Sequence, residues 1–179
     1  MSHLTIYAED NPSVKLVDTN DFTRIGRELS KVGVRFERWD IEAELSADAD
    51  NETVLEAYRP HVDALIGATG AGSADVIRMR PHSPGYGAMR RKFLDEHIHT
   101  EDEVRFFVDG SGVFTLHVDG RVYAARCDAN DLISVPAGVK HWFDAGDIPY
   151  FTVLRVFTDN TGWTPHYTGD AIAARFMQV

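Results

Sequence analysis

The sequence of 179 residues lacks the features that mark membrane or disulfide-bonded secreted proteins. Cys127 is the single cysteine, so an internal disulfide is impossible, and its place at the end of an expected strand suits a packed small side chain better than a nucleophile. No apolar run approaches the roughly 18 residues of a membrane helix, and the N-terminus lacks the basic-then-apolar pattern of a secretion signal. We therefore expect a cytoplasmic protein without a membrane partner.

Basic residues are also scarce. Lys and Arg number 18 against 28 Asp and Glu, so the formal net charge is −10. Nucleic-acid binding needs a basic face, and this balance argues against such a partner. The hydrophobic content of 44% is ordinary for a globular protein, and at this length we expect one domain over residues 1–179. No long exposed apolar helix or strand requires a second subunit, so we expect a monomer.

The first part of the domain, up to about residue 95, is expected to be rich in helices. Apolar spacing predicts one helix capped by Thr19 or Asn20 and ended by Gly33, and another that follows Asn51. Pro60 falls inside the second pattern and should kink or interrupt it. A short helix is expected over 86–95, and short strands are expected at 4–7, 34–39 and 76–79. The arginines and glutamate of 34–39 are most simply a solvated face.

From about residue 96 to 160 the pattern changes to strands. Asp119-Gly120 predicts a two-residue turn between strands at 113–118 and 121–125. Further strands are expected at 132–135, 141–144 and 150–157. Regularly spaced antiparallel strands with turn signals are typical of a small barrel or jelly roll. We predict a mainly β fold, a jelly-roll β-barrel with helices from the N-terminal third packed outside it.

The strongest chemical signal opens this β-rich part. His97 and His99 are two residues apart and would project to one side of a strand, while Glu103 opens a second extended run after a short polar turn. Two histidines and a carboxylate suit Fe(II), Ni(II), Mn(II) or Zn(II) and leave coordination positions open. The pair alone is more simply explained by two surface histidines in a chain that has eight. His141, which opens a later strand after a Pro/Gly turn, completes a set of three His and one Glu.

These two segments resemble the two motifs of the cupin superfamily. The first motif is matched at its ligands and its closing glycine, which are His97, His99, Glu103 and Gly110. The second is matched at its turn and its ligand, which are Pro136, Gly138 and His141. Arg91, Asn130 and Ala145 replace residues that the motifs place at turns. The departures thus affect loop geometry, and the resemblance implies a metal-binding cupin barrel.

Two arginines lie in expected strands of this barrel. Alternation from Glu103 puts Arg105 on the metal-facing side, close to the open coordination positions. An unpaired buried charge is costly, so Arg105 needs either a structural carboxylate or an anionic substrate, and the pattern favours neither. Arg155, in the apolar run 151–157, poses the same question, with a structural ion pair slightly favoured. Phe93, Phe143 and Trp163 flank or follow the ligand segments and are either core residues, the commoner case, or pocket walls.

A more specific resemblance is to the acireductone dioxygenase family. It is carried by four segments, which are 34–39, 92–107, 131–137 and 141–144. With Phe157 and the Gly162-Trp163 pair it covers nearly the whole chain, including the helix-rich part. The two long central segments are the specific ones, and the others support them.

The resemblance implies a reaction of methionine salvage in which O2 cleaves acireductone, 1,2-dihydroxy-3-keto-5-methylthiopentene. With Fe(II) the family makes formate and 2-keto-4-methylthiobutyrate. With Ni(II) it makes methylthiopropanoate, formate and carbon monoxide. One Fe2+ or Ni2+ per chain would be held by His97, His99, Glu103 and His141. Arg105 would stabilise the substrate anion as a catalytic and substrate-binding group, and the substrate pocket would also include Phe93, Phe143, Arg155 and Trp163.

Two other functions compete with this one. Another metal-dependent cupin enzyme, a different dioxygenase or an isomerase, would bind metal but leave acireductone untouched. A non-catalytic cupin that binds a small ligand usually lacks one or more metal ligands, and here all four are present. Because both product sets arise from one ligand set, the sequence does not distinguish Fe2+ from Ni2+.

Overall fold

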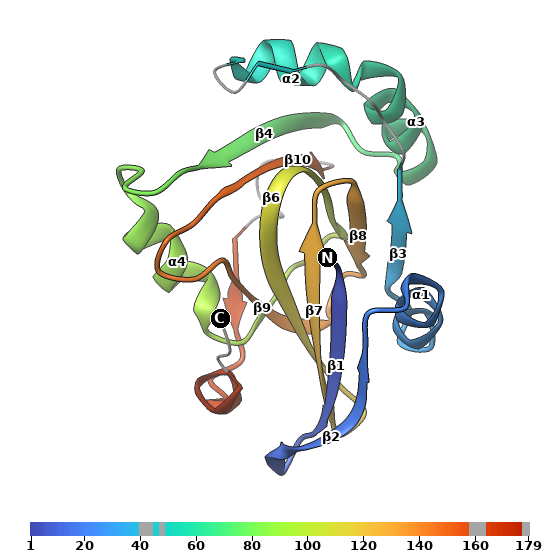
Figure 1. Ribbon diagram of the computed structural model, residues 1–179, viewed down its shortest axis with the longest axis vertical. Helices are drawn as coiled ribbons and strands as arrows, with labels where there is room; N and C mark the ends of the chain where they lie inside the picture. Colours follow the sequence, from blue (N-terminus) through green and yellow to red (C-terminus); the bar gives the residue numbers. More distant parts are fainter. Residues whose placement is uncertain (40–44, 47–48, 158–163, 177–179) are drawn as a thin grey trace.

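The computed structural model describes residues 1–39, 45–46, 49–157 and 164–176. Its centre is β6 (Glu103–Val118), a strand of 16 residues that belongs to two sheets (Figure 1). The first half of β6 pairs with β8 (Asp131–Val135) and β10 (Phe151–Phe157). The second half pairs with β7 (Arg121–Asp128) and β9 (Lys140–Asp144).

The change of partners in β6 occurs at Gly110. This residue has a φ of +75°, and a Cβ placed there would lie 1.9 Å from the backbone oxygen of Tyr150. Only glycine therefore allows the strand to pass from one sheet to the other at this point. The bend lets residues before and after it line a common interior.

All the strand pairs are antiparallel. The first sheet has the order β11-β5-β9-β6-β7-β1-β2, where the strands not yet introduced are β1 (His3–Ala8), β2 (Asn11–Thr19), β5 (His97–Ile98) and β11 (His166–Tyr167). The second sheet has the order β3-β8-β6-β10-β4, with β3 (Arg35–Arg38) and β4 (Ser73–Met79). The mainly β fold is confirmed, although the pairing among the described strands leaves the barrel open.

Alternation along β6 separates two apolar layers. Val104 and Phe106 pack outward against α2 (Asn51–Ala57) and α3 (Arg59–Thr69), which cover the outer face of the second sheet (Figure 1). Phe107 points the other way and packs with residues of both sheets in the interior. A short 3-10 helix, η1 (Ile172–Arg175), packs on the far side against β1, β7 and β9. The expectation that helices lie outside the strands is thus confirmed.

The helix boundaries differ from expectation by a few residues. The first helix ends at Ser30 rather than Gly33, and the second begins at Asn51 with Asp50 as its cap. The cap of α1 (Phe22–Ser30) is Asp21, whose carboxylate accepts a hydrogen bond from Arg24 N at 2.8 Å, rather than Thr19 or Asn20. Pro60 interrupts the second helical pattern as expected, since α2 ends at Ala57 and Pro60 lies in the first turn of α3. No helix among the described residues is long and apolar enough to cross a membrane.

One turn and one ion pair complete the frame. Asp119 and Gly120 both have positive φ, at 51° and 71°, which confirms the expected hairpin between β6 and β7. The solvated face expected for β3 is only partly correct. Arg38 donates to the fully buried carboxylate of Asp131 at 2.8 Å and so ties β3 to the start of β8.

Candidate metal centre

Three histidines converge at one end of the interior. His97 in β5 is the register partner of His141 in β9, so the two strands place their imidazoles side by side. His99 follows β5 by one residue, and its ring centroid lies 5.0 Å from that of His97 and 5.2 Å from that of His141. One ring nitrogen from each of the three lies within 4.8 Å of the others, and all three side chains are buried.

Glu103, the first residue of β6, adds a carboxylate to this group. Its Oε2 is 2.7 Å from His141 Nε2 and 3.5 Å from His99 Nε2. The four residues that the sequence suggests as ligands are therefore brought together from β5, the following turn, β6 and β9.

Backbone carbonyls fix the orientation of two of the rings. His97 Nδ1 donates to Asp95 O at 2.7 Å, and His141 Nδ1 donates to Val139 O at 2.8 Å. A carbonyl can only accept, so Nδ1 of each ring carries a proton and Nε2 points to the centre of the group, where His141 Nε2 lies 2.7 Å from Glu103 Oε2. This is how second partners orient metal-binding histidines in proteins.

His99 supplies a test of whether a cation fits. Its two ring nitrogens are buried and make no hydrogen bond within the described part of the chain. A buried polar atom without a partner is costly, and a divalent ion on one nitrogen would remove part of that cost. Three imidazoles and one carboxylate are also a donor set that Fe2+, Ni2+ and related ions accept. The residues present fit such an ion.

The protonation states agree with metal binding. Burial lowers the pKa of His97 to about 4, with the neighbouring His141 acting in the same direction, and burial also lowers the pKa of His99. Burial alone would raise the pKa of Glu103, but Arg105 and His141 outweigh it and hold that pKa below the usual range. At neutral pH the two imidazoles are therefore neutral and the carboxylate is ionised, as metal ligands must be.

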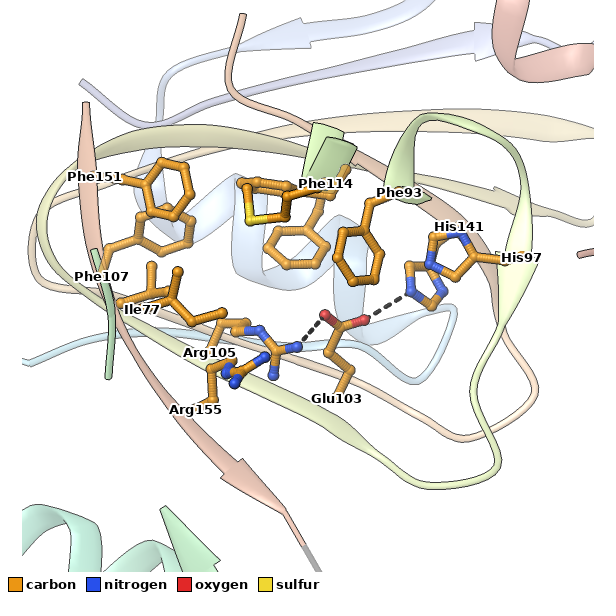
Figure 2. Close-up of a pocket in the computed structure, with 13 residues that line it drawn as sticks. Ile77, Phe93, His97, Glu103, Arg105, Phe107, Phe114, His141, Phe151 and Arg155 are labelled. Carbon is orange, nitrogen blue, oxygen red and sulfur yellow. Dashed lines mark hydrogen bonds and ion pairs between the residues drawn. The ribbon is translucent and has the colours of Figure 1, made fainter. Parts of the chain in front are cut away.

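A small cavity of about 40 Å3 adjoins the ligands (Figure 2). Its histidines lie at one end and Phe107 and Phe151 at the other, with Arg105 and Arg155 along one side. The site residues from the sequence that line it are Phe93, His97, Glu103, Arg105, His141, Phe143 and Arg155. Trp163 lies outside the described residues. The cavity thus combines a polar end with an apolar body.

Both arginines have a carboxylate partner. Arg105 Nη2 is 2.6 Å from Glu103 Oε1, and its Nη1 donates to Val104 O at 3.0 Å. Arg155 makes a two-point ion pair with Asp75 of β4, with Nε 2.7 Å from Oδ1. Burial lowers the pKa of Arg105 to about 10, so it remains a cation at neutral pH. The structural partner that the sequence slightly favours for Arg155 is therefore present.

The remaining wall of the cavity was not identified from the sequence as part of the site. It consists of Ile77 from β4, Met89 from α4 (Tyr86–Leu94), Phe107 and Phe114 from β6, and Phe151 and Val153 from β10. For Met89 a signal existed, because its spacing of four residues from Phe93 puts both on one helix face. For the others the sequence contains no comparable signal, since strand alternation does not reveal which strands face each other.

The chain is similar to known proteins over nearly its whole length. The model of the ARD/ARD′ family matches residues 3–165. Acireductone dioxygenase of Granulibacter bethesdensis is 62% identical over 176 residues, 98% of each chain, and that of Acidiphilium cryptum is 59% identical over the same shares. The solved structure of acireductone dioxygenase from Bacillus anthracis with a cadmium ion in its active centre matches with a TM-score of 0.81 at 28% identity. That match covers 93% of this chain and 98% of the other.

Proposed function

This chain belongs to the acireductone dioxygenase family, and from this premise we propose that it cleaves acireductone with O2 at one divalent metal ion held by His97, His99, Glu103 and His141. One observation carries the proposal beyond family membership. The four side chains meet beside a cavity that His97, Glu103 and His141 line at its polar end and whose remaining wall is largely apolar.

Three of the four proposed ligands are held in place by contacts within the protein. The carbonyls of Asp95 and Val139 fix the rings of His97 and His141, and the salt bridge to Arg105 fixes the carboxylate of Glu103. Such support limits the reorganisation that binding requires. A bound Fe2+ or Ni2+ supplies Lewis acidity for the enediol oxygens of the substrate and leaves coordination positions open to them.

The other cavity residues fit the two ends of acireductone. Arg105 lines the cavity beside Glu103, so its positive charge is placed where the oxygens of the enediolate would lie. Arg155 adds a second guanidinium on the same side. Phe93 and Phe143 provide apolar surface for the carbons next to the enediol, and with the buried phenylalanines behind them they keep water from the reacting atoms.

The reaction belongs to methionine salvage. We further propose that the chain holds one Fe2+ or Ni2+, that the iron form yields formate and 2-keto-4-methylthiobutyrate, and that the nickel form yields methylthiopropanoate, formate and carbon monoxide. We also propose a single-domain monomer that works in the cytoplasm.

The test is reconstitution of the stripped protein with Fe2+ and, separately, with Ni2+, followed by addition of acireductone and O2. Substrate loss is followed by absorbance and the products are identified. The proposal predicts metal-dependent turnover, with carbon monoxide from the nickel form alone. Tight metal binding without loss of acireductone would leave a metal-dependent cupin enzyme with another substrate.

A further inference from the structure

A second hollow lies behind one wall of the metal-site cavity. It is open to solvent, has a volume of about 520 Å3, and is here named the vestibule. Its lining residues from the strands are Asp75, Ile77, Arg155 and Phe157, and those from α4 are Ala88, Met89, Lys92 and Phe93. Four of these side chains, Ile77, Met89, Phe93 and Arg155, also line the inner cavity. A single layer of side chains therefore separates the candidate metal centre from the vestibule.

The inner cavity is too small for acireductone. Its volume of about 40 Å3 holds roughly three water molecules, and a substrate with a five-carbon chain and a methylthio group is several times larger. Binding therefore displaces some part of the wall. The side chains of the wall that move determine where the tail of the substrate lies.

The interior end of the cavity resists displacement. Phe107, Phe114 and Phe151 are at most 2% exposed and belong to the main apolar core, where close packing makes movement costly. The layer shared with the vestibule is only partly buried. It includes Met89, whose unbranched side chain repacks readily, and Phe93 in the last turn of α4. The vestibule side is therefore the one that opens.

Two contacts anchor α4 to the end of β9 and the residues that follow it. Tyr86 at the start of the helix donates its hydroxyl proton to Gly146 O. Arg90 binds the carboxylate of Asp144 at the end of β9 through Nε at 2.8 Å and Nη2 at 2.9 Å. Opening thus requires rotation of Met89 and Phe93 rather than displacement of the helix.

We propose that the alkylthio tail of acireductone passes between Ile77, Met89 and Phe93 and lies in the vestibule, so that these side chains govern which tails the enzyme accepts. The inference rests on the proposed function, because it takes the enediol end to be held at the metal ligands. Since the vestibule opens to solvent and contains apolar surface from Ala88 and Phe157, it accepts tails longer than methylthio.

The experiment uses the metal-loaded enzyme and acireductone analogues that share the enediol-ketone head and carry unbranched alkylthio tails from methyl to octyl. Wild type should turn over the octylthio analogue with a kcat/KM within about threefold of that for acireductone, or above it. Ala88→Trp fills the vestibule without reaching the inner cavity, and the octylthio-to-methylthio ratio of kcat/KM should fall at least about tenfold. Arg91→Trp is the matched control, because Arg91 is exposed on the same helix and lines neither hollow, and its ratio should equal that of wild type.

A second readout needs no turnover. With methyl-labelled methionine and no O2, the methyl resonance of Met89, assigned through Met89→Leu among the four methionines, should shift when acireductone binds. An unmoved Met89 resonance in the substrate-bound protein, or an Ala88→Trp ratio equal to that of wild type, overturns the inference. Absence of turnover with acireductone itself would instead contradict the proposed function.

Discussion

Replacing Arg105 by methionine should destabilise the metal-free protein much more than the metal-loaded protein. The salt bridge from Arg105 Nη2 to Glu103 Oε1 is 2.6 Å long, and the two side chains are only 10% and 8% exposed. Methionine keeps much of the length of the arginine stem but removes the charge. Glu103 then keeps as neighbours only the imidazoles of His141, at 2.7 Å, and His99, at 3.5 Å, in place of a permanent positive charge.

The size of the effect follows from this burial. Removal of one partner from a buried ion pair costs about 3–5 kcal/mol, because the other charge is left uncompensated. In a chain of this length 1 kcal/mol corresponds to about 2–4 °C in Tm, so Arg105→Met should lower the Tm of the metal-free protein by roughly 6–20 °C. A bound divalent ion supplies the missing positive charge, and the loss in the loaded protein should be below about 2 kcal/mol.

The assay is urea unfolding in the presence of a chelator, repeated with Ni2+. The double variant Glu103→Gln with Arg105→Met removes both charges, and it should recover much of the stability that Arg105→Met loses. A metal-free Arg105→Met protein within about 1 kcal/mol of wild type would show that Glu103 does not depend on Arg105 for its charge compensation. In the kinetic companion experiment, Arg105→Ala should keep its metal and raise the KM for acireductone. Unchanged kinetics would leave Arg105 a purely structural role.

Three further changes test separate parts of the structure. His99→Ala should abolish stoichiometric metal binding measured by elemental analysis, whereas His166→Ala, which alters an exposed histidine, should retain one ion per chain. Burial raises the pKa of Tyr86 to about 12, so the unfolded chain loses this proton first. Wild type should therefore lose roughly 2 kcal/mol relative to Tyr86→Phe as the pH rises from 10 to 12, and parallel stability curves would contradict this. Gly110→Ala should lower the free energy of unfolding by more than about 2 kcal/mol, because its Cβ would meet Tyr150 O. Gly138→Ala is the control, since Gly138 has a similar φ with open space around it, and this change should cost only about 1 kcal/mol. Equal losses in the two variants would contradict the steric explanation.

The ligand set could be predicted because its signals are local. His97 and His99 are spaced for one side of a strand, Glu103 follows after a turn, and a Pro/Gly turn precedes His141. Each of these features constrains the backbone within a few residues. The structure adds the cross-strand register of His97 with His141, which the spacing alone does not specify.

The shape of the site could not be predicted in the same way. Periodicity shows that Met89 and Phe93 share one face of a helix, but it does not show what that face covers. Ile77 and Asp75 reach the cavity region only because β4 pairs with β10 at the edge of the second sheet. The vestibule therefore depends on contacts between segments that are distant in the sequence.

Two features of the fold could not be predicted from the pattern of polar and apolar residues. β2 (Asn11–Thr19) is an edge strand with most of its residues exposed or partly exposed, so the alternation that reveals a half-buried strand is missing. Asp131 and Arg38 both look like surface charges in the sequence. Their pairing, with the carboxylate fully buried, arises from the packing of β3 on β8.

The metal assignment is tested by the position of the bound ion in a crystal of the nickel-loaded protein, measured by anomalous scattering at the nickel edge. We expect one strong peak per chain within coordination distance of His97, His99, Glu103 and His141. A second group of potential ligands, Glu96, His117 and Asp170, lies elsewhere in the described part of the chain. A peak at that group, with none among the three histidines and Glu103, would show that these four residues do not form the metal site.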